Sequence, residues 1–274
     1  MNLLAVESAT NLVGAAVVTG DRAVERSHQG GRRHAESLIP AVEEVLALAG
    51  LAAADLDAVA VDVGPGLFTG LRVGVATAKA LAQGLGIGVV PVGSLDILAA
   101  GAWEVAGGAG ADDPDRLDGP PTTVVPMVDA RRGEVFAARY DLGSDGGSND
   151  ATVATGPADP ADVRSSGPEL LTPGALAARL AGIEPGPGGR LLVVGDGAVR
   201  YLDVLMTAGM ADLTLAERVS SPSPLTLARL AARRLAAGAT PVAPGEVVPD
   251  YRREADARIN WEQRTPPTPA PPAP

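Results

Sequence analysis

The chain has 274 residues without a cysteine, and its 33 acidic residues outnumber 22 Lys and Arg residues, which gives a formal net charge of −11 at pH 7. The missing thiols exclude disulfides, cysteine nucleophiles and thiolate metal sites, and the acidic balance disfavours unaided binding to nucleic-acid phosphates. The length allows one large or two ordinary domains, and neither a membrane-spanning apolar run nor a basic leader is evident, so we expect a cytoplasmic protein.

The first hundred residues alternate apolar runs with helical patterns. Apolar runs bounded by turn residues predict strands at 3–6, 12–19, 23–28, 56–63 and 88–92. Apolar residues at spacings of three and four predict helices at 35–49 and 70–85. The first three strands follow one another through tight turns, whereas helices connect the later ones. This order, βββαβαβ, predicts a mixed sheet covered by helices.

The second half repeats part of this pattern. An apolar strand at 123–128 ends in Asp129, and a polar turn leads into another strand at 134–140. The same order of strand, acid, turn and strand occurs near the N-terminus, where the acid is Glu7. We interpret the repetition as two related halves. Farther along, the sequence predicts a loop or ragged hairpin at 143–160, a helix at 176–180, a strand at 191–194, a helix from 198 to 205, and a helix capped by Ser223.

These patterns divide the chain into five segments. They are an N-terminal lobe, a Gly/Asp/Pro-rich linker, a second and smaller lobe, a C-terminal helix with an extension that returns to the first lobe, and a disordered Pro-rich tail. Their boundaries are 1–106, 107–121, 122–222, 223–260 and 261–274.

Residues 64–72, GPGLFTGLR, form the most informative stretch, because they connect a predicted strand to a predicted helix. Glycines allow positive φ angles and close approach of other backbone segments, and Thr69 is expected to cap the first N–H groups of the helix. A turn of this kind suits either an anion or a closely packed backbone segment. The sequence leaves both interpretations open.

Two common kinds of catalytic site are disfavoured. The histidines, His28 and His34, are six residues apart, so a helix would point them in different directions and a shared metal is not expected. No Gly-x-Ser-x-Gly elbow is present for a serine nucleophile. The single lysine, Lys79, lies well inside a predicted helix and is expected to face solvent.

Five collinear motifs resemble those of the TsaB family of bacterial tRNA threonylcarbamoyladenosine biosynthesis proteins, noncatalytic members of the ASKHA (actin/sugar-kinase/Hsp70-like) superfamily. They lie at 3–8, 64–74, 129–136, 195–198 and 248–252, and the resemblance spans about residues 1–253. It implies an α/β ASKHA fold of two ribonuclease-H-like lobes with mixed sheets covered by helices. The chain departs from the family pattern at Glu7, where Asp is usual, and at Leu67, where Ser is usual.

The resemblance also implies a function. The chain is expected to be a noncatalytic scaffold and activator of the complex that makes N6-threonylcarbamoyladenosine at position 37 of tRNA. Its implied partners are TsaD in a heterodimer and TsaE in a ternary complex, with tRNA contacted indirectly, no membrane, and a homodimer plausible when the partner is absent. ATP and a metal ion belong to the assembled complex, because the metal-binding histidines of TsaD correspond here to Ser94 and Leu98.

The implied interface lies on the helices at 35–49 and 70–85. Its predicted contact residues are His34, Glu36, Ser37, Val42, Glu43, Leu71, Arg72, Val75 and Ala78. The alternative is a free-standing ASKHA ATPase or small-molecule kinase. Its cleft, vestigial in a noncatalytic subunit, would be built from Glu7, Gly64, Gly66, Thr69, Asp129, Gly195 and Asp196.

Overall fold

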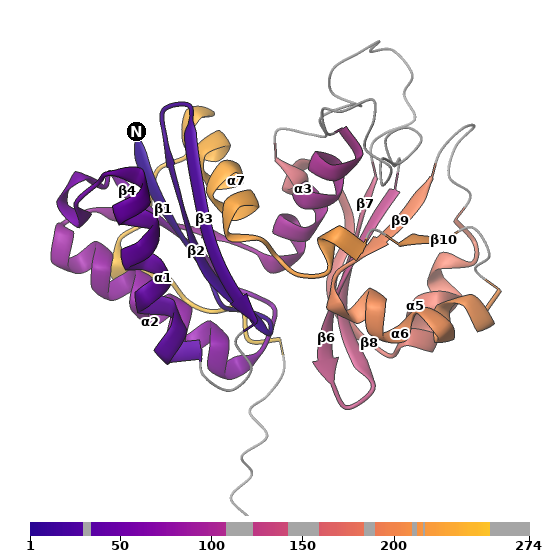
Figure 1. Cartoon of the computed structure of the whole chain (residues 1–274). Coiled ribbons are helices and arrows are strands. Elements are labelled where there is room, and N and C mark those ends of the chain that lie inside the picture. The colour runs from indigo at the N-terminus through magenta and orange to yellow at the C-terminus, as the bar shows by residue number, and fades with distance from the viewer. Residues whose placement is uncertain are drawn as a thin grey trace, which may run out of the picture.

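The computed structural model describes residues 1–29, 34–107, 123–141, 159–183, 190–209, 213–215 and 217–252. It shows two lobes, each built on a five-stranded mixed sheet with helices packed against it (Figure 1). Of the segments predicted from the sequence, nearly all of the linker, most of the loop at 143–160 and the whole tail at 261–274 lie outside the described residues.

The sheet of the first lobe has the order β3-β2-β1-β4-β5. Its strands are β1 (Asn2–Glu7), β2 (Leu12–Thr19), β3 (Arg22–Gln29), β4 (Ala58–Asp62) and β5 (Gly88–Val92). The first three are antiparallel because tight turns connect them, whereas β4 and β5 run parallel to β1 because helices form their crossovers. Those helices are α1 (His34–Ala49) and α2 (Phe68–Leu85). The five predicted strands and both predicted helices are confirmed.

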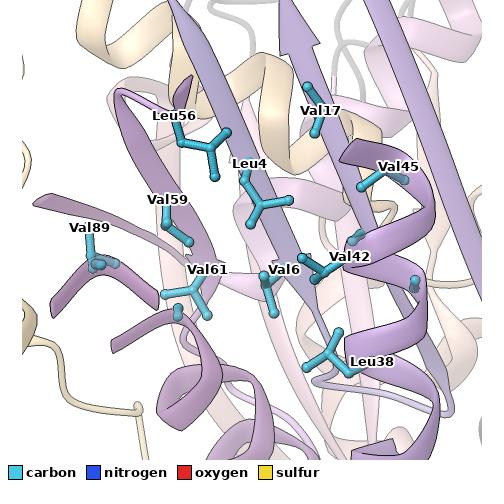
Figure 2. Packing of buried hydrophobic residues seen from close by; sticks show 14 of the residues in the cluster. Leu4, Val6, Val17, Leu38, Val42, Val45, Leu56, Val59, Val61 and Val89 are labelled. Carbon is cyan, nitrogen blue, oxygen red and sulfur yellow. The ribbon is translucent and has the colours of Figure 1, made fainter. Parts of the chain in front are cut away.

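Helices cover both faces of this sheet, so the central strands are buried on both sides. Along β1, Leu4 and Val6 pack toward α1 and α2, while Leu3 and Ala5 pack toward α7 (Pro224–Ala236). Figure 2 shows the first of these two cores, with Val42 of α1 directed at the strands. This double coverage explains why β1 and β4 read as continuous apolar runs.

The second lobe repeats the strand order of the first. Its sheet, β10-β9-β6-β7-β8, contains β6 (Thr123–Arg131), β7 (Glu134–Asp141), β8 (Arg164–Leu171), β9 (Leu191–Val194) and β10 (Leu213–Leu215). The strands β6, β7 and β8 are antiparallel, and β9 and β10 continue parallel to β6. The helices α5 (Pro173–Leu180) and α6 (Asp196–Thr207) pack on it. The predicted duplication and the ribonuclease-H-like fold of both lobes are therefore confirmed.

Helix α3 (Ser94–Gly107) lies between the lobes and was not predicted. Ile97 packs in the core of the first lobe, whereas Leu98 and Trp103 pack in the core of the second. A helix buried on two sides lacks a single apolar stripe, which removes the pattern by which helices are recognised. The capping prediction for α7 is confirmed, since the Ser223 hydroxyl accepts hydrogen bonds from two N–H groups of its first turn.

The remaining described elements are short. They are the 3-10 helices η1 (Ala53–Asp55), η2 (Pro160–Val163), η3 (Glu217–Val219) and η4 (Pro244–Glu246). Among the described residues, no helix combines the length and apolar character needed to cross a membrane.

Residues 239–252, here named the C-terminal strap, run along the first lobe. Val242 forms two backbone hydrogen bonds with Val89 of β5, at 2.8 and 2.9 Å. Val247 is buried in the core beneath α2, and the N–H of Asp250 donates to the carbonyl of Val63 at 2.7 Å. The strap thus extends the β5 edge of the first sheet and ends beside the glycine-rich turn.

Candidate functional site in the cleft and on the first helix pair

Two buried carboxyl groups meet at the ends of β1 and β4. Glu7 and Asp62 are 0% and 2% exposed, and one oxygen of each carboxyl, Oε2 of Glu7 and Oδ2 of Asp62, is buried without a further hydrogen-bond partner. The hydrogen bonds of the other oxygens are local, since Glu7 accepts from the N–H of Ala9 at 2.8 Å, and Asp62 accepts at 2.7 Å from both the N–H of Gly64 and the hydroxyl of Ser94. Burial and then the neighbouring Asp62 raise the pKa of Glu7 well above its ordinary value, and burial raises the pKa of Asp62 to about 6. Two adjacent buried carboxyls retain a proton and share it.

Replacing Glu7 by Gln is expected to make the protein less sensitive to alkaline pH. Because both folded-state pKa values are raised, the stability that this pair contributes is present below the ordinary carboxyl pKa and is lost as the pH rises through about 6. The amide donates to Asp62 at every pH, so E7Q should gain stability over the wild type between pH 5 and 8, by roughly 1 to 2 kcal/mol. Urea titrations at several pH values measure this difference, with the exposed Glu43→Gln as control. Parallel pH profiles of the wild type and E7Q would contradict the shared proton.

The glycine-rich turn uses two of its amides inside the protein. The N–H of Leu67 donates to the carbonyl of Ala9 at 2.7 Å, and the N–H of Gly64 is bound by Asp62. A Cβ atom at position 66 would overlap the Ala9 carbonyl oxygen, so glycine is required by close contact with the β1–β2 connection. Of the two interpretations left open by the sequence, the structure therefore favours the packed backbone segment.

The predicted role of Thr69 is wrong. Helix α2 begins at Phe68, its N-cap residue is Leu67, and the cap is made without a side-chain hydrogen bond. Thr69 is exposed in the first turn. The helix starts earlier than predicted because Leu67 already has the extended backbone of a cap residue and its carbonyl accepts from the N–H of Leu71.

The acid at the corresponding place in the second lobe is paired with arginines. Asp129, 3% exposed, lies 3.0 Å from Nη1 of Arg131 and 3.5 Å from Nη1 of Arg200. The N–H of Asp129 donates at 2.9 Å to Asp196, whose pKa is raised by burial. The second glycine turn also packs closely, because a Cβ atom at Gly195 would overlap the carbonyl oxygen of Met127.

The structure therefore places the predicted cleft residues in two groups. Glu7, Gly64 and Gly66 lie in the first lobe, and Asp129, Gly195 and Asp196 lie in the second. A hydrogen bond of 3.2 Å from Nη2 of Arg131 to the side chain of Asn11 joins the polar turns of the two lobes. Each group is satisfied mainly by neighbouring backbone amides and arginines.

A second contact between the lobes was missed in the sequence. Asp96 of α3, 4% exposed, accepts hydrogen bonds from Tyr140 at 2.8 Å, from Arg234 of α7 at 3.2 Å, and from Arg164 of β8. Arg234 also binds both oxygens of Asp159, at 2.6 and 2.7 Å. We name these five residues the interlobe clamp. The available signal was Asp96 itself, an isolated acid in an otherwise apolar stretch.

The residues that correspond to the metal ligands of TsaD do not fit a metal. Ser94 and Leu98 lie one turn apart on α3, but the Ser94 hydroxyl donates to Asp62 and Leu98 is packed in the core of the second lobe. A leucine side chain offers no donor atom. Over the described residues, no group of three or more His, Cys, Asp or Glu side chains is arranged to hold a metal ion.

The predicted interface residues divide by exposure, and four of them are placed wrongly. These four, buried in the first lobe, are Val42, Leu71, Val75 and Ala78. They face inward because the apolar stripe of each helix packs on its own sheet. Glu36, Glu43 and Arg72 are exposed, Ser37 is half-buried, and the side chain of His34 lies outside the described part of the structure.

The outward face of α1 and α2 is composed of other residues. Its exposed positions include Ile39, Pro40, Phe68, Ala76 and Ala80 in addition to the charged residues above. Lys79 was expected to face solvent, but it is half-buried and donates a hydrogen bond of 3.1 Å to the carbonyl of Val247 in the C-terminal strap. The strap is therefore fixed directly to α2.

Comparison with known proteins relates this architecture to tRNA modification. The family model described as TsaD, tRNA N6-adenosine threonylcarbamoyltransferase, matches residues 24–261. The tRNA threonylcarbamoyladenosine biosynthesis protein TsaB of Escherichia coli is 31% identical over 146 residues, which cover 53% of this chain and 58% of the relative. TsaB of Bacillus subtilis is 32% identical over 141 residues, 51% of this chain and 55% of the relative. The chain thus spans little more than half the length of these relatives.

A solved structure extends the similarity to both lobes. A Pseudomonas aeruginosa protein described as similar to the peptidase YEAZ superposes with a TM-score of 0.69 and 25% identity, covering 92% of this chain and 99% of the other. The fold of this chain therefore has an experimental counterpart over most of its length.

Proposed function

The chain belongs to the tRNA N6-adenosine threonylcarbamoyltransferase (TsaD) family, and from this membership and its similarity to TsaB proteins we propose that it is a noncatalytic scaffold and activator in the synthesis of N6-threonylcarbamoyladenosine at position 37 of tRNA. In this role it binds TsaD and stabilises the arrangement of TsaD that is competent for transfer, which requires no catalytic group on this chain. TsaE joins the pair, and tRNA, ATP and the metal ion are held by the complex.

The observation that carries this proposal is the closure of both glycine turns on the protein's own backbone. At Gly66 and Gly195 an added Cβ atom would lie 2.3 and 2.2 Å from a neighbouring carbonyl oxygen, and an oxygen that close to each turn offers a phosphate no hydrogen-bond donor. In the first turn the N–H groups of Gly64 and Leu67 are engaged, and Asp129 is paired with Arg131 and Arg200. These contacts support the proposal that the two turns stabilise the fold and do not bind a nucleotide.

The outward face of α1 and α2 supports the location of the partner contact. It combines small residues such as Ala76 and Ala80 with exposed apolar residues such as Ile39, which is 45% exposed. Small side chains let a partner helix approach closely, and apolar ones contribute to affinity when they are covered. A paired set of helices on TsaD fits this face.

Replacing Ala76 by Arg is expected to abolish co-elution with TsaD while leaving the thermal stability of the isolated chain within about 1 °C, because the position is exposed and surface substitutions change folding little. Co-expression with TsaD from the same organism, size-exclusion chromatography and a tRNA modification assay measure the effect. Ala178→Arg, on the exposed side of α5 in the second lobe, is the matched control.

Retained assembly of A76R, with a functional complex, would move the interface elsewhere. The alternative of a free-standing ATPase or kinase makes a different forecast, since it requires micromolar affinity of the isolated chain for magnesium and ATP. The scaffold proposal requires affinity weaker than about 0.1 mM in calorimetry, or a free energy near −5.5 kcal/mol.

A further inference from the structure

An arginine at the start of α2 is framed by aromatic rings from two distant parts of the chain. The guanidinium carbon of Arg72 lies 3.7 Å from the ring centroid of Phe68 and 5.9 Å from that of Tyr251. Its Nε group donates to the Tyr251 hydroxyl at 3.3 Å, and the two ring centroids are 5.0 Å apart. Phe68 and Tyr251 are 38% and 43% exposed. We name these three residues the aromatic–arginine cluster.

Arg72 differs from most arginines of the protein in its partners. Within the described part of the chain it has no carboxylate partner, although the protein carries 33 acidic residues and ten other described arginines are paired with acids. Stacking on an aromatic face stabilises a guanidinium group while leaving its outer N–H groups available. Those groups match the two oxygens of a carboxylate.

The geometry of the cluster is held in place before any partner binds. Tyr251 belongs to the C-terminal strap, which is tied to the first lobe through Val242, Val247 and Asp250 as described above. The next residue, Arg252, donates at 3.0 Å to the carbonyl of Pro168 in the second lobe. A preordered site loses less conformational entropy on binding, so its contacts contribute more fully to affinity.

We propose that the aromatic–arginine cluster is the anchor point of the partner-binding face and that it receives the carboxylate of an Asp or Glu side chain on the partner protein. The inference rests on the proposed function, since it assigns the chemistry by which TsaD is bound. Buried Arg and Tyr residues commonly dominate binding at protein interfaces. The exposed Val248, beside the cluster in sequence, adds apolar surface of the kind that surrounds such an anchor.

A carboxylate fits better than a nucleic-acid phosphate. Binding to a nucleic-acid backbone needs several unpaired cations in a row. Here the nearby Arg252 is already paired with Asp250 at 2.7 Å. One available guanidinium beside two aromatic rings suits a single acidic side chain.

The test measures the dissociation constant of the purified chain for TsaD by biolayer interferometry at two salt concentrations. Arg72→Gln is expected to weaken binding 10- to 100-fold and to reduce its dependence on salt, and Arg72→Lys should fall between the two because a lysine lacks the planar pair of donors. Tyr251→Ala should weaken binding about 10-fold. Arg179→Gln, an exposed arginine of the second lobe, is the control and should leave the constant unchanged.

The outcomes are distinct. If the wild type binds TsaD and R72Q binds equally well at both salt concentrations, the anchor proposal is overturned while the proposed function stands. If the wild type fails to bind TsaD, the proposed function fails and the anchor proposal fails with it. Loss of affinity for tRNA in a filter-binding assay, without loss of affinity for TsaD, assigns the cluster to nucleic acid and overturns the proposal. Thermal melts of the three Arg72 variants verify folding. Rescue of Arg72→Glu by an acid-to-Arg change on TsaD would identify the bound carboxylate.

Discussion

Replacing Gly195 by Ala is expected to lower the free energy of unfolding by about 4 kcal/mol, the combined scale of backbone strain and forced overpacking. Gly195 has a φ angle of +99°, a conformation that residues with a side chain rarely adopt. Its added methyl group would also overlap the carbonyl oxygen of Met127 in β6, so the turn cannot relax without moving the central strand of the second sheet. Urea denaturation followed by circular dichroism measures the loss.

A matched glycine separates the two causes. Gly238 has a φ angle of +97°, but a Cβ atom there would meet nothing within 4 Å. Gly238→Ala should therefore lower the free energy of unfolding only by the cost of backbone strain, about 1 to 2 kcal/mol. Equal losses for the two variants would mean that close packing of the second glycine turn contributes nothing, which would weaken the argument against a phosphate site.

Replacing Arg234 by Gln is expected to destabilise the protein by about 3 kcal/mol, the usual scale for removing one partner of a buried ion pair. The side chain is only 16% exposed and binds both Asp96 and Asp159. Without it, two partly buried carboxylates lose their main counter-charge, although Arg164 and Tyr140 still bind Asp96. The interlobe clamp joins both lobes, so we expect their unfolding transitions to separate in differential scanning calorimetry.

Arg229 provides the control on the same helix. Its side chain is 49% exposed and lies 3.7 Å from Glu104, so Arg229→Gln should cost less than about 1 kcal/mol. If R229Q and R234Q are equally destabilised, burial of the clamp has no special importance for the joint between the lobes.

Much of the fold could be predicted from the sequence because local signals and tertiary packing agree. Tight turns identify the β1–β2–β3 meander, and the combination of Ser223 with Pro224 identifies the start of α7. Helix α3 was not predicted because both lobes bury it and no polar face remains. Strand β8, RSSGPELL, was not predicted because it carries a Gly-Pro step and few apolar residues, as strands at a sheet edge often do.

The candidate site could be predicted less completely from the sequence, for two physical reasons. An apolar stripe on a helix marks a buried face without saying which neighbour buries it. The sequence therefore predicts that Val42 and Ala78 contact a partner, although their own sheet covers them. The second reason is distance along the chain. The clamp joins Asp96 to Arg234, and the aromatic–arginine cluster joins Arg72 to Tyr251, so neither has a local spacing to detect.

The return of α7 and the C-terminal strap to the first lobe has a consequence for biosynthesis. The sheet of that lobe is complete by Val92, yet one of its faces is covered by α7, and its β5 edge pairs with the strap. During translation the second lobe is therefore synthesised before the first lobe can finish folding. Premature stop codons or proteolytic cuts near residue 220 should expose the apolar underside of the N-terminal sheet, and they should send the fragment to chaperones or degradation even though every strand of that sheet has been made.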